Sequence, residues 1–327
     1  MTNGAIYDII FNVEGTIENI SPYDRKEEKI MNEKNTKFDR RKKYYMVLDC
    51  ETATMPYAQN FEGSARQKIA IAKPLIYDLG WQIIDRQGNV YAKRNFLIAE
   101  IFSVPSIFNT AYYASKRPLY LEKLAKNEIE LTSWATATEM LYNDLQIVDS
   151  VGAYNSMFDF KKAIPFTELY INMLYSPNYN EWEQMQNRII DNIVNEPSKS
   201  NKTFDPEHFN FRGNNYSMFD IWGLSCEHII NNNEYKQMCI DNGWTSPSAK
   251  FFKTSAETTY RYFKGDNEFI ESHTALDDAE IESEIFTEIL KRTKNKFEMG
   301  IIYFPFRILG KVEDFEILQT AKKMGII

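Results

Sequence analysis

The chain of 327 residues lacks the residues that build several common kinds of site. It has only three cysteines, Cys50, Cys226 and Cys239, with no CxxC spacing. Their number and spacing argue against a disulfide framework and a zinc site, and they fit the reducing cytosol, so we expect a cytoplasmic protein. No apolar run approaches the length of a membrane helix, and residues 1–13 carry Asp8 and no basic start. We therefore expect no membrane partner and no signal peptide.

The chain also lacks an excess of basic residues. It has 38 Lys and Arg against 46 Asp and Glu, which gives a formal net charge of -8. A protein that coats duplex DNA is normally basic, so a broad phosphate-binding surface is disfavoured. An enzyme that grips only a strand end and uses metal ions as its positive charge remains compatible with this balance. The hydrophobic fraction of 43% is enough for a sizeable core.

The stretch from Tyr44 to Thr52 is the first one that indicates chemistry. An apolar run ending at Leu48 leads directly into Asp49 and, two positions later, Glu51. Alternate side chains of a strand share a face, so these two carboxylates point together at the end of a buried strand. Such a pair is costly unless a cation compensates it, and oxygen ligands suit Mg²⁺ or Mn²⁺. A strand end in a solvated turn gives the same short pattern.

Periodicity along the chain predicts an α/β fold, with a central mixed sheet flanked by helices. The expected strands cover residues 44–50, 75–84, 90–98 and 147–153, with a hairpin turn at 85–89. The expected helices include 133–145, 255–263 and 274–290, one starting near Lys161, and one at 312–324. We divide the chain into an N-terminal extension (1–43), a main domain (44–296) with a polar insertion at about 178–211, and a C-terminal tail (297–327).

A second candidate cluster begins at His273. Near a helix start, this histidine and a carboxylate five positions later can face one site, so Asp278 is the favoured ligand. Asp277 is the favoured solvent-facing neighbour, although spacing alone does not separate the two. His208 and His228 have no partner at ligand spacing and are expected to be structural. A partly buried structural histidine is the alternative for His273 itself.

In chain order, three segments resemble the motifs of the DEDDh 3′-to-5′ exonucleases of the DnaQ-like family, which have the ribonuclease H-like fold. The first is Asp49-Cys50-Glu51-Thr52, the second is Asn155-Ser156-Met157-Phe158-Asp159, and the third is His273 with Asp278 and Ala279. The resemblance covers about residues 44–292. The chain departs from the pattern in the long gap between the second and third motifs, in its first 43 residues and in its tail.

The resemblance implies a two-metal site for phosphodiester hydrolysis. The two divalent ions, Mg²⁺ or Mn²⁺, would be held by four carboxylates, namely Asp49, Glu51, Asp159 and Asp278. His273 would take the proton from the attacking water, a role that suits a side chain with a pKa near neutrality.

The same resemblance implies an exonuclease that works from the 3′ end of single-stranded DNA or RNA and releases nucleoside 5′-monophosphates. Thr52, Asn155 and Phe158 would bind the substrate, while a core aromatic is an equally good interpretation of Phe158. A polymerase or a replication or repair protein is a candidate partner. Two alternatives stay open: a ribonuclease of the same fold that trims RNA ends or short oligonucleotides, and a non-catalytic module that binds nucleic-acid ends or anchors a polymerase.

Overall fold

The computed structural model describes residues 38–54, 73–175 and 208–324. The chain divides between Lys42 and Lys43 into two units, and only residues 38–42 of the first are described, so the fold below is that of the second. Most of the N-terminal extension and of the insertion predicted at 178–211 lies outside the described residues. Among the helices that the structure describes, none has the length and apolar character needed to cross a membrane.

A seven-stranded mixed sheet carries the architecture, in the order β4-β3-β2-β1-β5-β7-β6. The strands are β1 (Tyr44–Thr54), β2 (Pro74–Asp85), β3 (Val90–Ile98), β4 (Glu130–Thr132), β5 (Ser150–Ala153), β6 (His208–Phe211) and β7 (Asn214–Asp220). The central strand β1 is antiparallel to β2 and parallel to β5. The predicted α/β class with a mixed sheet is confirmed.

Helices flank the sheet. They are α4 (Ala99–Phe102), α5 (Pro105–Phe108), η3 (Ala114–Lys116), α6 (Arg117–Ala125), α7 (Trp134–Leu145), α8 (Ser156–Phe158), the π-helix η4 (Asp159–Ala163), α9 (Ile164–Leu174), α11 (Ile221–His228), α12 (Asn233–Asp241), α13 (Ala256–Lys264), α14 (Ala275–Arg292), η5 (Pro305–Leu309) and α15 (Val312–Lys323). Ser133 caps α7, because its side chain accepts from the Thr136 N–H at the start of the helix.

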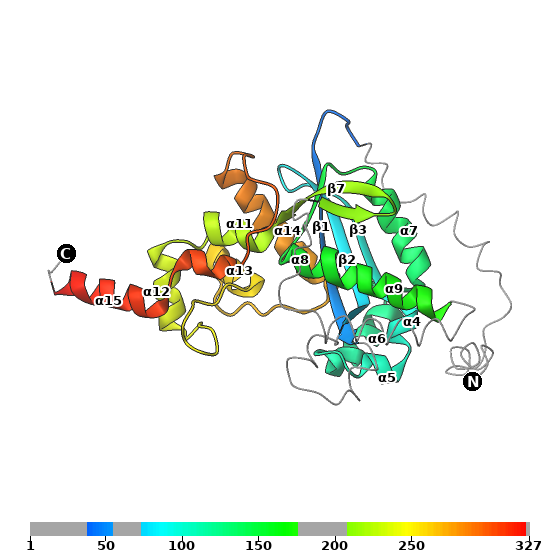
Figure 1. Ribbon diagram of the computed structural model, residues 1–327, viewed down its shortest axis with the longest axis horizontal. Helices are drawn as coiled ribbons and strands as arrows, with labels where there is room; N and C mark the ends of the chain where they lie inside the picture. Colours follow the sequence, from blue (N-terminus) through cyan, green and yellow to red (C-terminus); the bar gives the residue numbers. More distant parts are fainter. Residues whose placement is uncertain (1–37, 55–72, 176–207, 325–327) are drawn as a thin grey trace, which may run out of the picture. The chain divides into compact units, whose positions relative to one another are not determined.

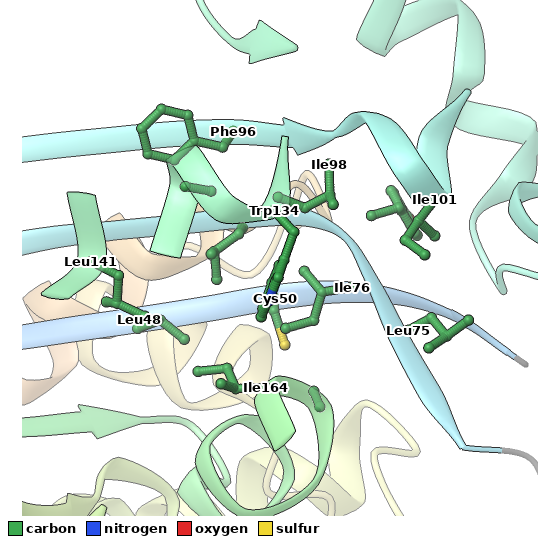
Figure 2. Close-up of a cluster of buried hydrophobic side chains, with 14 of the residues drawn as sticks. Leu48, Cys50, Leu75, Ile76, Phe96, Ile98, Ile101, Trp134, Leu141 and Ile164 are labelled. Carbon is green, nitrogen blue, oxygen red and sulfur yellow. The ribbon is translucent and has the colours of Figure 1, made fainter. Parts of the chain in front are cut away.

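Each face of the sheet is covered by its own apolar core. The first core joins Met46, Leu48 and Cys50 of β1 to side chains of α7 and α9, including Trp134 and Ile164. Figure 2 shows Trp134 and Ile164 close to Leu48 and Cys50 of β1. The second core joins alternate residues of the same strand to α11, α14 and the C-terminal segment; it includes Tyr45, Val47, Ile285, Phe286 and Phe315. Figure 1 shows α7 and α14 on opposite sides of β1. β1 is therefore buried on both faces, as its sequence predicts.

Several boundaries differ from the sequence predictions; β1, for example, ends at Thr54 and not at 50. β5 begins at Ser150 and not at 147, because Asp149 uses a carboxylate oxygen and its own N–H to hold the backbone of Tyr44. The helix expected from Lys161 begins at Ser156 and runs through the π-helix η4, where Pro165 has no N–H to donate to the preceding turn. Residues 208–211, assigned to the polar insertion, form β6.

The C-terminal segment belongs to the same unit as the sheet. The side chains of Val312 and Phe315 on α15 are buried in the second core. The backbone N–H of Gly300 donates to the carbonyl of Met218 on β7. The residues set apart as a tail therefore pack on the second face of the sheet.

Helix α14 crosses the sheet at Gly80. A Cβ at this position would lie 2.2 Å from the backbone nitrogen of Leu276 and 2.5 Å from the carbonyl carbon of Ala275. The Ala275 N–H also donates to Asp78 Oδ2 at 2.9 Å. Gly80 is thus required for the close approach that sets the first turn of α14 against β2.

We expect Gly80→Ala to destabilise the fold by about 3 kcal/mol, the upper end of the usual cost of overpacking, because rigid backbone stands where the new methyl group would go. Chemical denaturation measures this loss. Gly243→Ala is the control: the space around its added Cβ is open, so only its left-handed φ of +66° should cost about 1 kcal/mol. Equal losses in the two variants would contradict the close approach of α14.

Candidate metal centre

The first acidic pair extends the inner face of β1. Tyr45 and Val47 point into the second core, and Asp49 and Glu51 follow on the same face, opposite Gly80 and Asp78 of β2. The strand pairing shifts register between Glu51 and Thr52. Such β-bulges re-aim side chains and are common beside functional sites. The alternation predicted from the sequence therefore places both carboxylates beneath the start of α14.

The second segment follows β5 and is held by Asp220. Asn155 has a left-handed φ of +85°, and its N–H and that of Ser156 both donate to Asp220 Oδ1, at 3.1 and 3.0 Å. This turn delivers Asp159 to the beginning of the π-helix, where the carboxylate is buried and accepts a hydrogen bond from Cys50 Sγ at 3.0 Å. Asp159 thus reaches the sheet next to β1.

The third segment separates the two aspartates that spacing alone could not. Asp277 Oδ2 accepts hydrogen bonds from Lys123 Nζ at 2.7 Å and from Ser272 Oγ at 2.9 Å, and its side chain is 38% exposed. The side chain of Asp278 is only 6% exposed and lies 3.8 Å from His273 Nδ1. Asp278 is therefore the inward-facing residue, and Asp277 secures the helix start to α6.

The structure brings the first and third motifs together. One ligand atom from each of Glu51, His273 and Asp278 lies within 4.8 Å of the others. A second group with the same mutual spacing shares His273 and adds Glu257 and Glu271. His273 thus stands between two pairs of carboxylates, one formed by predicted site residues and one that the sequence analysis missed.

Burial sets the electrostatics of this cluster. It raises the pKa of Glu51 and that of Asp278 to about 9, and the pKa of Asp159 to about 7. The pKa of Asp49 lies well above its ordinary value, first because of burial and then because of the charge of Glu282. These shifts mean that the carboxylates are poorly compensated when no cation is bound.

Glu282 is a further carboxylate at the site that the sequence analysis did not single out. It lies on α14 one turn beyond Asp278, so the two share a helix face. Its side chain is buried, and Oε2 accepts from the Tyr154 N–H at 3.0 Å. The i, i+4 spacing from Asp278 was the available signal, but acidic pairs at this spacing are frequent on solvated helix faces.

The donor set fits a divalent cation that prefers oxygen ligands. Asp278 Oδ1 is buried and has no hydrogen-bond partner within the described residues. A buried carboxylate oxygen without a partner is costly, and a metal ion would satisfy it. Oxygen ligands from several carboxylates are the set that Mg²⁺ and Mn²⁺ take, whereas the three cysteines are all buried as free thiols.

The remaining predicted residues lie around this cluster in different ways. Thr52 directly follows Glu51 at the bulge and pairs with Ile76. Phe158 is partly buried and packs against the first core, which matches the core-aromatic interpretation of this residue. His208 begins β6, and His228 lies 3.6 Å from the neighbouring Glu227 at the end of α11.

Comparison with known proteins provides no family assignment. The chain matches no protein-family model, and a search of curated proteins finds no relative.

We expect the metal-free protein to lose stability as pH rises from about 5 to about 9. Folding raises the pKa of Glu51 from 4.5 to about 9. The folded state therefore binds more protons than the unfolded state between these values, and stability falls as those protons leave. Mg²⁺ should reverse the loss, most strongly at high pH, because metal binding needs deprotonated carboxylates.

Thermal unfolding in EDTA and in MgCl₂ at a series of pH values measures both effects. Asp278→Asn is the comparison variant, because it removes a buried carboxyl group whose pKa is raised to about 9, like that of Glu51. The pH dependence of its unfolding temperature should therefore be weaker, both in EDTA and in MgCl₂. A metal-free unfolding temperature that rises with pH by the same amount in both proteins would contradict the electrostatic account of the cluster.

Proposed function

We propose that the chain is a metal-dependent 3′-to-5′ exonuclease of single-stranded nucleic acid, a DEDDh enzyme with a ribonuclease H-like fold. The observation that carries the proposal is the meeting of Glu51, His273 and Asp278 within 4.8 Å. These residues come from motifs more than 200 residues apart in the chain. Asp159, from the remaining motif, lies buried beside β1. The order of the motifs and their meeting at one end of β1 both support this class.

In this function Asp49, Glu51, Asp159 and Asp278 hold two divalent ions. The ions supply charge neutralisation on the scissile phosphate and a more acidic attacking water. The positions of the four carboxylates would determine where that phosphate lies. Those positions are in turn set by the backbone segments to which the carboxylates belong. Glu282 adds negative charge behind Asp49 and strengthens the attraction for cations at this end of the strand.

His273 acts as the general base. Its Nδ1 lies 3.7 Å from Glu271 and 3.8 Å from Asp278, so Nε2 is the nitrogen left to accept a proton from water. Burial and then the charge of Lys116 lower the pKa of His273. A lowered pKa keeps the imidazole neutral at pH 7 and above, which is the form that a general base requires.

The preference for a strand end follows from the charge of the protein. At a net charge of -8 the chain exerts little long-range attraction on an internal duplex segment. Thr52 and Asn155 would hold the terminal nucleotide next to the metal-binding carboxylates, and Phe158, which packs against the first core but is only partly buried, would contact it with its exposed part. The choice between DNA and RNA depends on contacts to the 2′-hydroxyl, so a ribonuclease of the same fold is the second candidate.

The requirement for a free 3′ end is the most direct test. We expect a 5′-labelled single strand to shorten stepwise in MgCl₂, because the terminal nucleotide must enter beside Thr52. A strand with a 3′-phosphate and a circular strand should resist, and a blunt duplex should be cut more slowly because its end must fray. Gel sizing of DNA and RNA versions of each substrate measures these rates.

Asp49→Asn is the matched control for this experiment, since it keeps the shape of the side chain and removes one metal-binding charge. The Asp49→Asn variant should release no shortened strands or nucleotides over the same time course. Rapid cutting of the circular strand would show an endonuclease. Binding of the labelled strand with no metal-dependent release of nucleotides would favour the non-catalytic module instead.

Glu282→Gln should weaken Mn²⁺ binding by about 10-fold or more, the usual effect of a residue that supports metal ligands. Glutamine keeps an oxygen that can accept from the Tyr154 N–H, so the loss reports the charge alone. Titration calorimetry with MnCl₂ gives the affinity. Glu280→Gln is the control, because Glu280 lies on the same helix but is exposed and pairs with Lys93 at 2.6 Å. Unchanged Mn²⁺ affinity in Glu282→Gln would exclude Glu282 from the metal centre.

A further inference from the structure

His273 is held in an unusual way for a residue between a loop and a helix. Its φ of +51° lies in the left-handed region, which is unfavourable for a residue with a side chain. Its side chain is 27% exposed, so packing in a core does not fix the ring. Something else must determine which way the imidazole faces.

An aromatic ring from a distant segment covers the imidazole. The rings of Tyr113 and His273 are stacked, with centroids 4.3 Å apart and planes 13° from parallel. Parallel stacking restricts rotation of both rings, and aromatic pairs of this kind contribute stability beyond the area that they bury. The stack therefore favours one orientation of the His273 ring.

Lys116 completes the same arrangement from the next turn of the chain. Its ammonium group lies 4.6 Å from the centroid of the Tyr113 ring and donates a hydrogen bond to the carbonyl of Ser272, the residue before His273. One side chain thus contacts both the ring that covers His273 and the backbone that carries it.

The segment that supplies both residues is itself anchored in the first core. Arg117 follows Lys116, donates to the carbonyl of Phe102 at 3.1 Å, and lies over the rings of Phe102 and Phe108 at 4.8 and 5.1 Å. Both phenylalanines are buried. A support that is fixed to the core can transmit its position to the residues it holds.

We propose that Tyr113 and Lys116 are positioning residues that hold the His273 imidazole in its working orientation against Glu51 and Asp278. Tyr113 does so by stacking on the ring, and Lys116 does so by holding Tyr113 and the Ser272 carbonyl. The effect on cleavage rests on the proposed exonuclease function, whereas the effect on ring orientation does not.

Ring-current shifts test the orientation without any substrate. The chain has three histidines, so the proton spectrum of the imidazoles is simple, and His273→Gln assigns the His273 signals. Protons stacked on Tyr113 should be shifted upfield. Tyr113→Leu should remove the shift, and Tyr113→Phe should keep it.

Tyr112→Leu is the matched control for the spectra. Tyr112 is the adjacent residue, is 89% exposed, and meets Tyr113 edge-on with centroids 4.8 Å apart. Its removal should leave the His273 signals upfield. An unshifted His273 in the wild-type protein, or a shift that survives Tyr113→Leu, would overturn the proposal.

Single-turnover cleavage of a 5′-labelled strand tests the consequence for catalysis. Tyr113→Leu should lower the rate at saturating substrate by about 10²-fold, the cost of misplacing a reacting group by about 1 Å, with half-saturation nearly unchanged. Tyr113→Phe should restore the rate, and Lys116→Met should lower it in the same direction.

A double-mutant cycle separates positioning from a general loss of structure. In a His273→Gln background, Tyr113→Leu should have no further effect on the rate, because the group it positions is gone. An equal further loss in that background would overturn the positioning role. If the wild-type protein cleaves no strand, the exonuclease proposal fails, and the ring-current result alone decides whether Tyr113 holds His273.

Discussion

The constraint on which this structure depends is the group of buried carboxyl groups gathered near the end of β1. Asp49 and Glu51 lie on the same face of β1 as Tyr45 and Val47, whose side chains pack in the second core. Asp278 and Glu282 meet them from α14, and burial raises the pKa of each of the four. A fold with a core on only one side of the sheet would open here to admit water. The second core, which includes the stacked rings of Phe219 and Phe286 at 4.2 Å, keeps α14 down on the carboxylates.

Two other carboxylates hold the backbones that carry this cluster. Asp78 accepts from the Ala275 N–H at the start of α14, and Asp220 accepts from the N–H groups of Asn155, Ser156 and Gly223. Because backbone donors surround Asp220, its charge is used to hold structure, although burial still raises its pKa to about 6. Asp78 and Asp220 thus position the backbones that carry the motifs. Among the described residues, Asp278 Oδ1 and Asp78 Oδ1 are buried without a hydrogen-bond partner.

Local patterns in the sequence predicted much of this arrangement. Alternation along β1 correctly placed Asp49 and Glu51 on one face, and the strand at 90–98 was found at its true position. The start of β5 was missed because it is decided by a side-chain contact between Asp149 and Tyr44, which lie 105 residues apart. β6 was missed because its burial depends on pairing with β7 and not on a long apolar run.

The same limit explains which site residues the sequence left hidden. Glu282 and Tyr113 belong to none of the three motifs. They come close to the other residues of the cluster only when α14 and the segment before α6 pack against the sheet. The spacing of His273 and Asp278 was visible, but the choice between Asp277 and Asp278 required Lys123, from a helix more than 150 residues earlier. Site residues that lie close together in the sequence could be found by inspection, whereas those that only folding brings together could not.

The acidity of the site also bears on the order of events in the proposed reaction. Without cations, Glu51 and Asp278, whose pKa lies at about 9, stay largely protonated at neutral pH, and each carboxyl group of the cluster that ionises would repel a phosphate. The protein as a whole carries a net charge of -8. Burial raises the pKa of Glu51, and the charge of Lys116 offsets only part of that rise. Lys116 is also already engaged with Ser272 and Tyr113. One lysine in that position cannot neutralise several buried carboxylates and a phosphodiester together. In the proposed reaction, metal ions would therefore bind before the strand end or together with it, and divalent cations would govern substrate binding as well as the chemical step.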